Sequence, residues 1–420
     1  MAAGMLGYVR GVILPGPGAG ASAIPDTTRG NQSGLYPSWL GARELLLHGR
    51  DPYSPEVTAE IQEGVWGHRL DLKNPDDPKD ESRFAYPLYV VFLLAPTIGL
   101  PFPLVQILYV SIALAVSVAS VWLWLHFFGH GPSLLFRAVS SILLVGSYGA
   151  LAGLHLQQLT LIVAALIAGS LACIATGRLW AAGMMLAFGT VKPQLTIALV
   201  AWLLVWASAK WRARRILFLS FTATMAALLF GAELLLPGWI WEWQQTLSAY
   251  MDYAPLSPAH LQMVFGRFGG SIAGAAVMVA IAAFCWRIRR DSADSDRFKF
   301  VPALMLVTYL VISPVWHFYD YVLLLPGVLL ALHWQQDSNR MRPSERAFVS
   351  ISAIVLAWQW ISATGLSITA AVSPAWAQKG QFLFTISMLF APTMTAISLI
   401  LIARSRFSVH RPEHFRKIGL

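Results

Sequence analysis

The sequence predicts an all-α membrane protein, a polytopic bundle of hydrophobic helices. Of its 420 residues, 56% are hydrophobic and only 12% are charged, and the mean hydropathy is +0.59. These shares lie well outside those of soluble domains. Apolar runs long enough to cross a hydrocarbon core of about 30 Å recur between residues 103 and 403. Because the runs are continuous rather than alternating, they predict membrane helices and exclude the strands of a β-barrel.

Residues 1–32 open the chain with a weak apolar stretch that glycines and two prolines, Pro15 and Pro17, interrupt. The stretch lacks the continuous apolar core of a signal peptide. The segment GPGAG at 16–20 has neither a preceding strand nor a following Lys-Ser pair, so it does not match a phosphate-binding loop. We expect a flexible or degenerate N-terminal segment.

Residues 33–83 predict an acidic outer loop with an amphipathic juxtamembrane helix. Ten acids face six bases between residues 30 and 83. In SGLYPSWLGARELLLHGRDPYSP (33–55), apolar residues gather on one helical face and Gly49 is placed to end the helix. Such a helix would lie on the membrane surface. Three aromatic residues would then lie at headgroup level, and we assign them to substrate binding: Tyr36, Trp39 and Tyr53.

Residues 84–403 hold the predicted transmembrane bundle. It begins with FAYPLYVVFLLAPTIGL (84–100), which is short and interrupted by Pro87 and Pro96, so we expect a re-entrant or interfacial helix there. About eleven spans follow, and we expect them at residues 103–128, 134–153, 155–176, 179–191, 193–208, 214–236, 267–286, 300–313, 317–333, 347–370 and 382–403.

Lys and Arg cluster in short links that all fall on one side if these spans alternate. The links lie at residues 210–215, 287–299 and 340–346, and residues 404–420 form a basic tail. Short basic links face the cytoplasm, so the tail is expected to be cytoplasmic. The acidic loop and the segment around Lys192 then face outward. We expect a multi-pass protein of the cell (cytoplasmic) membrane with its active site on the extracytoplasmic side.

Composition and spacing also exclude several classes of site. The formal charge of +9 lies in short links between apolar runs, so no nucleic-acid partner is expected. Cys173 and Cys285 each lie inside an apolar run, and the ten histidines are scattered without a metal-ligand pattern. We therefore expect no metal site and no cofactor.

The segment GTVKPQL (189–195) is the first candidate for chemistry. Gly189, Lys192 and Pro193 break an otherwise long helix, and backbone exposed in this way must be buried in protein or face a cavity. Lys192 is a point charge suited to a phosphate group. The alternative is a lysine that extends from a helix end to the membrane surface.

Two further segments gather polar groups at the outer ends of spans. SPVWHFYDYV (313–322) brings Trp316, His317 and Asp320 to one membrane edge, where a ring and a titratable pair would suit carbohydrate chemistry. The alternative is an aromatic belt at the interface. In GLHLQQLT (153–160), Gln157 and Gln158 are neutral donors and acceptors for hydroxyl groups, although contacts between helices would use them equally well.

Taken in order, these motifs resemble the family 87 glycosyltransferases of the C superfamily, which include polyprenol-phosphate-mannose-dependent mannosyltransferases. The resemblance rests on Tyr36, Trp39, GARELLLHG, DPY, FAYPLYVVFLLAP, KPQL and SPVWHFYDY, and it runs from about residue 33 to residue 335. It implies a multi-span enzyme that moves a sugar from a lipid phosphate, with inversion, to a lipid or glycan acceptor. It also implies that Lys192 binds the carrier phosphate and that His317 and Asp320 lie near the sugar or the leaving group.

One position departs from the pattern of this family. The acid that acts as general base normally stands just before the Tyr-containing start of the amphipathic helix, and here that position is Gly34. Three explanations stay open: an inactive or repurposed member, another acid such as Asp51 or Asp26, or an altered N-terminal region. Asp51 is the preferred substitute, because GRDPY places its carboxylate on a rigid turn beside an aromatic ring.

The sequence therefore favours an integral-membrane glycosyltransferase that moves a hexose, with mannose the first candidate, from a polyprenyl-phosphate donor. Its expected partners are this donor, a lipid or glycan acceptor and the membrane lipids. A transporter or flippase of a lipid-linked sugar is the alternative, since a broken helix at GTVKPQL would also permit transport. A catalytically inactive family member is the third hypothesis.

Overall fold

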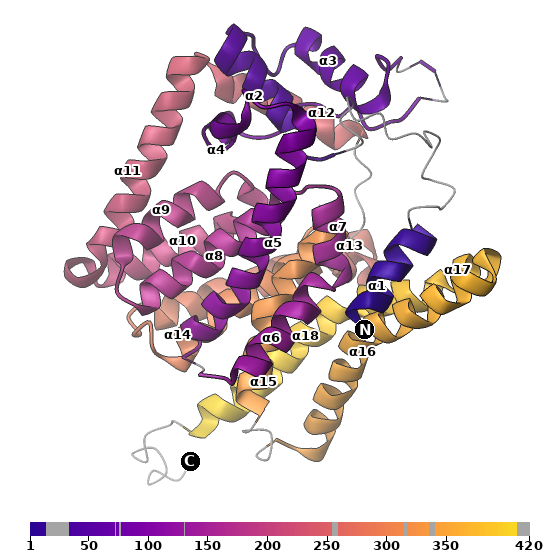
Figure 1. Ribbon diagram of the computed structural model, residues 1–420. Coiled ribbons are helices and arrows are strands. Elements are labelled where there is room, and N and C mark those ends of the chain that lie inside the picture. Colours follow the sequence, from indigo (N-terminus) through magenta and orange to yellow (C-terminus); the bar gives the residue numbers. More distant parts are fainter. Residues whose placement is uncertain are drawn as a thin grey trace.

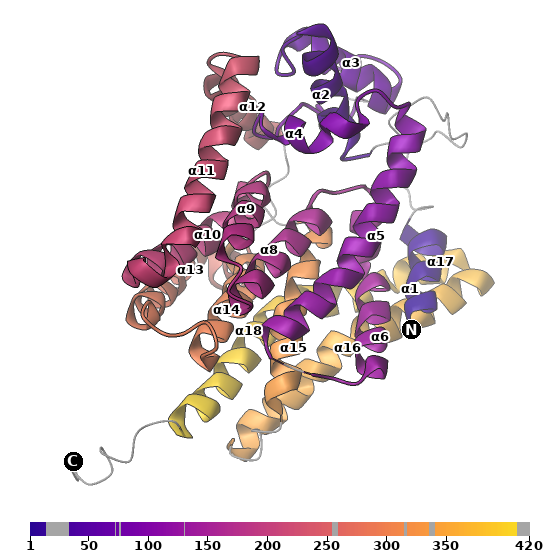
Figure 2. The same ribbon diagram turned by 60° about the vertical axis from the view of Figure 1, so that its left-hand side comes forward.

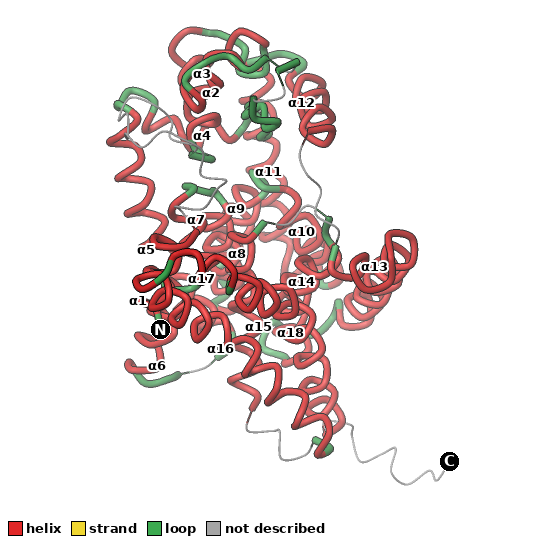
Figure 3. The backbone as a smooth tube through the Cα atoms, turned by 90° about the vertical axis from the view of Figure 1, so that its right-hand side faces the viewer, coloured by secondary structure: helices red, strands yellow, loops and turns green. Residues whose placement is uncertain are grey.

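The computed structural model describes residues 1–13, 33–71, 73–74, 77–129, 131–253, 259–314, 317–335 and 341–409. All regular secondary structure in these ranges is helical (Figure 3). This confirms the all-α class. Two parts stand out in Figure 1, a large bundle of apolar helices and a smaller group of helices at one end of it.

Most bundle helices begin and end within about five residues of the predicted spans, but the span expected at 134–153 is divided into two helices, and α13 and α18 extend beyond the spans expected at 267–286 and 382–403. The bundle helices are α5 (Phe102–Phe127), α6 (Leu134–Val145), α7 (Tyr148–His155), α8 (Thr160–Ala175), α9 (Leu179–Gly189), α10 (Pro193–Ala209), α11 (Trp211–Leu235), α13 (His260–Ile288), α14 (Asp296–Ile312), η3 (Phe318–Leu324), α15 (Leu325–Trp334), α16 (Pro343–Val372), α17 (Pro374–Lys379) and α18 (Gln381–Val409).

Five helical segments in the described residues are long and apolar enough to cross a membrane: α5, α11, α13, α16 and the segment from α17 into α18. The pair α6 and α7 makes a sixth if its 57° bend belongs to one span. The helices α8, α9, α10 and η3 with α15 are apolar but shorter. The chain is thus a multi-pass membrane protein, and the predicted number of eleven spans is not confirmed.

The cap is the smaller group of helices at one end of the bundle, together with its connecting residues 77–89 (Figures 1 and 2). Its helices are α2 (Tyr36–His48), α3 (Pro55–Trp66), α4 (Val90–Leu94), η2 (Ala95–Thr97) and α12 (Trp239–Tyr253). Gly49 ends α2 in the left-handed conformation, with φ of 67°, as the sequence predicts. The helices α4 and η2 are too short to cross a membrane, which agrees with the interfacial segment expected at 84–100.

Aromatic packing forms the core of the cap. The ring of Tyr36 meets Phe102 of α5 edge to face at 4.8 Å, and Trp39 lies 5.0 Å from the same ring. The indole of Trp39 also donates a hydrogen bond to the carbonyl of Thr97 at 3.2 Å. Tyr53 packs on Phe84 at 5.1 Å. The apolar face of α2 is therefore covered by protein rather than left open to lipid.

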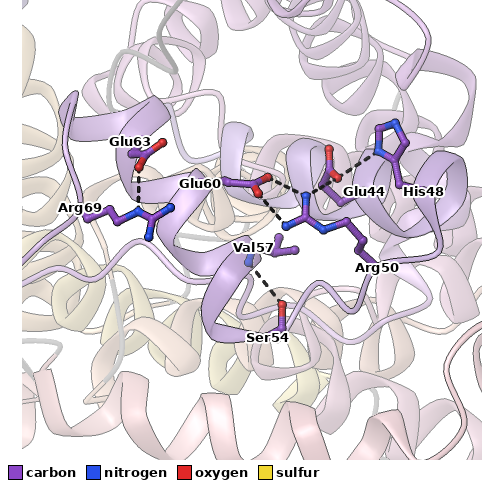
Figure 4. A network of polar contacts seen from close by, with 8 residues as sticks. All are labelled: Glu44, His48, Arg50, Ser54, Val57, Glu60, Glu63 and Arg69. Atoms are coloured by element: carbon purple, nitrogen blue, oxygen red, sulfur yellow. Dashed lines mark hydrogen bonds and ion pairs between the residues drawn. The ribbon is translucent and has the colours of Figure 1, made fainter.

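A polar network joins α2 to α3 on the surface of the cap (Figure 4). The guanidinium of Arg50 bridges Glu44 of α2, at 2.9 Å, and Glu60 of α3, at 2.6 Å. Glu44 is only 7% exposed, and His48 lies 3.0 Å from the same carboxylate. Ser54 accepts a hydrogen bond from Val57 N–H and so caps the start of α3. These contacts fix the turn that connects the two helices.

The basic links lie together at the opposite end of the bundle helices. Arg214 donates to the carbonyls of Trp206 and Arg289, at 2.8 and 3.0 Å, and so joins the start of α11 to the end of α13. Lys299 of α14 donates to the carbonyl of Phe128, just after α5, at 3.2 Å. Two ion pairs then attach the C-terminal helix to the starts of α14 and α16: Arg406 with Asp296 and Arg404 with Glu345.

The N-terminal segment differs from the flexible leader that the sequence predicts. Residues Ala2–Tyr8 form α1, and Val9–Ile13 continue it as the short π-helix η1. This helix packs on α16 because Gly4 and Gly7 allow a close approach: a Cβ atom there would overlap the side chains of Thr364 and Ser367. Pro15, Pro17 and the segment GPGAG at 16–20 lie outside the described residues.

Candidate active site

A cavity of about 560 Å³ lies between the cap and the bundle. Polar and aromatic side chains from three directions line it. The residues just before α2 and the connecting residues of the cap contribute Ser33, Gly34, Asp80, Arg83 and Tyr86; the cap helix α12 contributes Trp243, Leu247, Tyr250 and Met251; and the bundle contributes Gln158, Lys192, His317, Tyr319 and Asp320. Apolar walls with a few convergent polar groups are typical of small-molecule sites.

Lys192 lies in the connection between α9 and α10, outside both helices, and is 5% exposed. Its ammonium group donates to the hydroxyl of Thr160 at 2.8 Å and to the amide oxygen of Gln158 at 3.3 Å. It also lies 4.8 Å from the ring centre of Tyr319. The local chain is held in place by Tyr89, whose hydroxyl donates to the carbonyl of Thr190 at 2.9 Å.

The hydrogen bonds of Lys192 go to neutral oxygens, so its charge remains available to an anion in the cavity. Burial lowers the pKa of Lys192 to about 8, and the nearby carboxylate of Asp320 opposes this shift. The ammonium form therefore still predominates at pH 7. A buried cation at the wall of a cavity can stabilise a phosphate group, or negative charge that develops during a reaction.

Asp320 lies in η3 and holds the start of that helix. One oxygen of its carboxylate accepts the backbone N–H of His317 at 3.0 Å, and the other accepts the hydroxyl of Thr160 at 3.0 Å. Asp320 is 3% exposed, whereas His317 is exposed and lines the cavity. The imidazole of His317 stacks on Tyr319 with 4.9 Å between ring centres. Thr160 thus connects Lys192 to Asp320, and Asp320 fixes the turn that presents His317.

The helix α12 closes the side of the cavity. The indole of Trp243 donates to the carbonyl of Ala85 at 3.2 Å, which joins α12 to the connecting residues of the cap. Partial burial raises the pKa of the Tyr250 phenol, and the carboxylates of Asp80 and Asp320 raise it further. Tyr250 therefore faces carboxylates from both the cap and the bundle.

Comparison with known protein families identifies this architecture. The model of glycosyltransferase family 87 matches residues 84–314, more than half of the chain. The chain belongs to glycosyltransferase family 87. The match covers α12 and the Lys192 connection, and the acidic loop 33–83 lies outside it. No curated protein matches the sequence.

This family 87 member brings four of the predicted site residues together in the cavity, from segments far apart in the sequence: Gln158, Lys192, His317 and Asp320. Trp316, the predicted aromatic neighbour of His317, lies outside the described residues. Among the described residues, no group of three or more His, Cys, Asp or Glu could hold a metal ion.

Five other predicted site residues do not line the cavity. Tyr36 and Trp39 are buried in the cap core, and the hydroxyl of Tyr53 donates to the carbonyl of Tyr86 at 2.8 Å. The carboxylate of Asp51 accepts the backbone N–H of Tyr53 at 2.8 Å. The side-chain oxygen of Gln157 accepts the hydroxyl of Ser33. These contacts shape the cap and its attachment to the bundle, and the predicted site roles of these five residues stay predictions.

Gly34 lines the cavity, but the space for a side chain there is already filled. Its backbone N–H donates to the carbonyl of Leu156 at 2.8 Å. A Cβ atom on Gly34 would overlap the amide of Gln158, and it would lie 3.1 Å from the Leu156 oxygen. The cap backbone therefore approaches the turn between α7 and α8 too closely for an acid at this position without rearrangement.

Sequence reasoning missed Asp80, Arg83, Tyr86, Thr160 and the α12 residues. Asp80 is one of ten acids in an acidic loop, so its sequence context resembles that of a solvated residue. For α12, a usable signal exists: WIWEWQQTLSAYMDY mixes aromatic and polar residues, as an interfacial helix does. Only the fold brings that helix to the same cavity as Lys192.

Proposed function

We propose that this family 87 glycosyltransferase moves a hexose, with mannose the first candidate, from a polyprenyl-phosphate donor to a hydroxyl group of a lipid or glycan acceptor. The observation that carries the proposal is Lys192, a buried cation at the wall of the cavity with its hydrogen bonds on neutral oxygens. A lipid phosphate is the leaving group of such a transfer, and a fixed cation beside it stabilises the charge that develops as the bond breaks.

The proposed donor is a membrane lipid because the cavity lies between a membrane bundle and its cap. The phosphate would bind beside Lys192 and Gln158, and the sugar would lie against Tyr86, Tyr319 and His317, which line the same cavity. Aromatic rings offer apolar surface to the C–H groups of a sugar, while the imidazole and the amide can bind its hydroxyl groups.

We place the cavity on the extracytoplasmic side of the cell membrane. The helices α5, α10 and α14 each have one end at the basic links and the other toward the cavity or the cap. Basic links favour the cytoplasmic side, so the opposite end, with its acidic loop, would face outward. A donor carried by a lipid is available at that surface, where a nucleotide-sugar is not.

The test is transfer by the purified protein in liposomes supplied with an acceptor lipid and either a polyprenyl-phosphate-linked labelled hexose or the matching nucleotide-sugar. We expect label to reach the acceptor from the first donor and not from the second. Lys192→Ala should slow transfer about 100-fold, the scale of losing one group that stabilises a developing oxyanion. Lys379→Ala, which removes an exposed lysine from α17, is the matched control.

Two results would contradict the proposal. Transfer from the nucleotide-sugar alone would refute the lipid donor, and full activity in Lys192→Ala would refute the phosphate site. Movement of intact sugar lipid across the liposome membrane, without transfer, would instead support a flippase.

A further inference from the structure

Among the residues that the structure describes, two carboxylates line the cavity, Asp80 and Asp320. Asp320 is 3% exposed, and both of its oxygens already accept hydrogen bonds, from Thr160 and from the His317 backbone. Asp80 is exposed, and its carboxylate accepts a hydrogen bond from the backbone N–H of Ser82 at 2.9 Å. Asp80 can therefore accept a proton from a molecule in the cavity, whereas Asp320 serves the fold.

We propose that Asp80 is the general base that removes the proton from the acceptor hydroxyl. This inference rests on the proposed function, because it names the group that activates the acceptor in the same transfer. A base must lie within hydrogen-bond reach of the proton that it takes, directly or through one water molecule. Of the two carboxylates described at this cavity, Asp80 is the exposed one with an oxygen left to accept that proton.

The segment that carries Asp80 is held in a defined conformation. Ser82 has a φ of 49°, which is uncommon for a residue other than glycine and persists where surrounding contacts fix it. Gln62 of α3 donates to the carbonyl of Glu81 at 3.2 Å, and the Glu81 carboxylate accepts the Nε of Arg83 at 2.6 Å. The turn is thus attached to α3 on one side and braced by an ion pair on the other, which directs Asp80 to the rim of the cavity.

The base and the cation come from different parts of the fold. Asp80 belongs to the connecting residues of the cap, and Lys192 belongs to the bundle. An inverting displacement requires a base and a cation on opposite sides of the anomeric carbon, because the acceptor oxygen attacks that carbon from the face opposite the leaving phosphate. The new bond joins the acceptor oxygen to the anomeric carbon, the bond from that carbon to the phosphate oxygen breaks with its electron pair, and the hydroxyl proton passes to Asp80.

Asp26, the other acid that the sequence offered, lies outside the described residues. Within the described residues, the alternative positions are less suited to this role. Asp51 does not line the cavity, and its carboxylate accepts the N–H of Tyr53. At position 34 the amide of Gln158 fills the space that a carboxylate would need. With Asp80, the chain has a base at the cavity without an acid at position 34.

The test measures transfer and donor binding separately in Asp80→Asn. This substitution keeps an oxygen that can accept the Ser82 N–H, so the turn should persist, but an amide cannot act as the base. We expect kcat to fall by a factor of about 100 or more, the usual contribution of a general base, with donor affinity unchanged. Asp80→Glu should restore part of the rate. Glu56→Gln, which changes an exposed acid on α3 outside the cavity, is the matched control.

The outcomes separate this inference from the proposed function. If Asp80→Asn transfers sugar at the wild-type rate, the inference about Asp80 is overturned and the proposed function is not. A loss of donor binding in Asp80→Asn, equal to that in Lys192→Ala, also overturns the inference, because a base for the acceptor leaves the donor site intact. A wild-type protein that transfers nothing from the lipid donor overturns both proposals.

Discussion

At the scale of single residues, the proposed function depends most on the buried ammonium group of Lys192. It combines burial, which disfavours its charge, with hydrogen bonds to Thr160 and Gln158, which hold the ammonium in one position. Its pKa of about 8 is close to physiological pH. Small changes in pH therefore alter the fraction of protein in which Lys192 is charged.

This pKa predicts how activity depends on pH. Lys192 is charged below about pH 8 and neutral above it. In the proposed function, the charged form binds the carrier phosphate. We expect kcat/KM for the donor to fall about tenfold for each pH unit above 8. Lys192→Arg keeps its charge throughout this range, because the guanidinium titrates above pH 12. A pH-rate series on both proteins checks the prediction, and an equal fall in the two would refute it.

Gly34 and Gln158 give a second prediction at this scale. Gly34→Ala should slow transfer, because its methyl group displaces the Gln158 amide that helps to hold Lys192. In a Gln158→Ala background the space is free, so adding Gly34→Ala should change little. Transfer rates of the four proteins give the coupling between the two positions. If the effects of Gly34→Ala and Gln158→Ala on the transfer rate are additive, the overlap between position 34 and the Gln158 amide is not the cause of the slower transfer.

At the scale of elements, the helices were predictable and their contacts were not. The apolar runs gave the ends of α5, α10 and α14 within a few residues, because hydropathy and length determine where a membrane helix can lie. The motifs at Lys192, His317 and Asp320 were visible because breaks and charges are conspicuous in apolar surroundings. In the acidic loop one acid does not stand out among many polar residues, so the sequence did not single out Asp80 as a candidate base.

The aromatic residues of α2 were given a site role from the sequence, although the fold buries them. Tyr36 and Trp39 were assigned to substrate binding because an amphipathic helix was expected to lie on the membrane. The chain folds α3, α4 and η2 against that helix, so the rings become part of the cap core. Periodicity predicts which face of a helix is apolar, but it does not predict what covers that face.

The bridge between α2 and α3 yields a prediction for the cap. Arg50→Ala removes both ion pairs that connect these helices and leaves the mostly buried Glu44 with His48 as its remaining partner (Figure 4). We expect faster amide hydrogen exchange in α2 and α3, with the bundle unchanged. Arg69→Ala, which breaks an exposed pair with Glu63, is the control and should leave exchange near the wild-type rate. Equal exchange in both variants would contradict the role of Arg50.

At the scale of the whole molecule, the basic links and the cavity lie at opposite ends of the same helices. This arrangement predicts which positions a membrane-impermeant thiol reagent can reach. After Cys173 and Cys285 are replaced, Lys79→Cys in the cap should be labelled in intact cells, and Asp294→Cys in the α13–α14 link only after the membrane is opened. The reverse pattern would place the site in the cytoplasm.

The most direct measurement is an experimental structure of the protein with a non-transferable analogue of a polyprenyl-phosphate hexose. We expect the phosphate within hydrogen-bond distance of the Lys192 ammonium, and the anomeric carbon between that phosphate and the Asp80 carboxylate. A phosphate bound away from Lys192, or a sugar whose anomeric carbon faces away from the cap, would contradict the account.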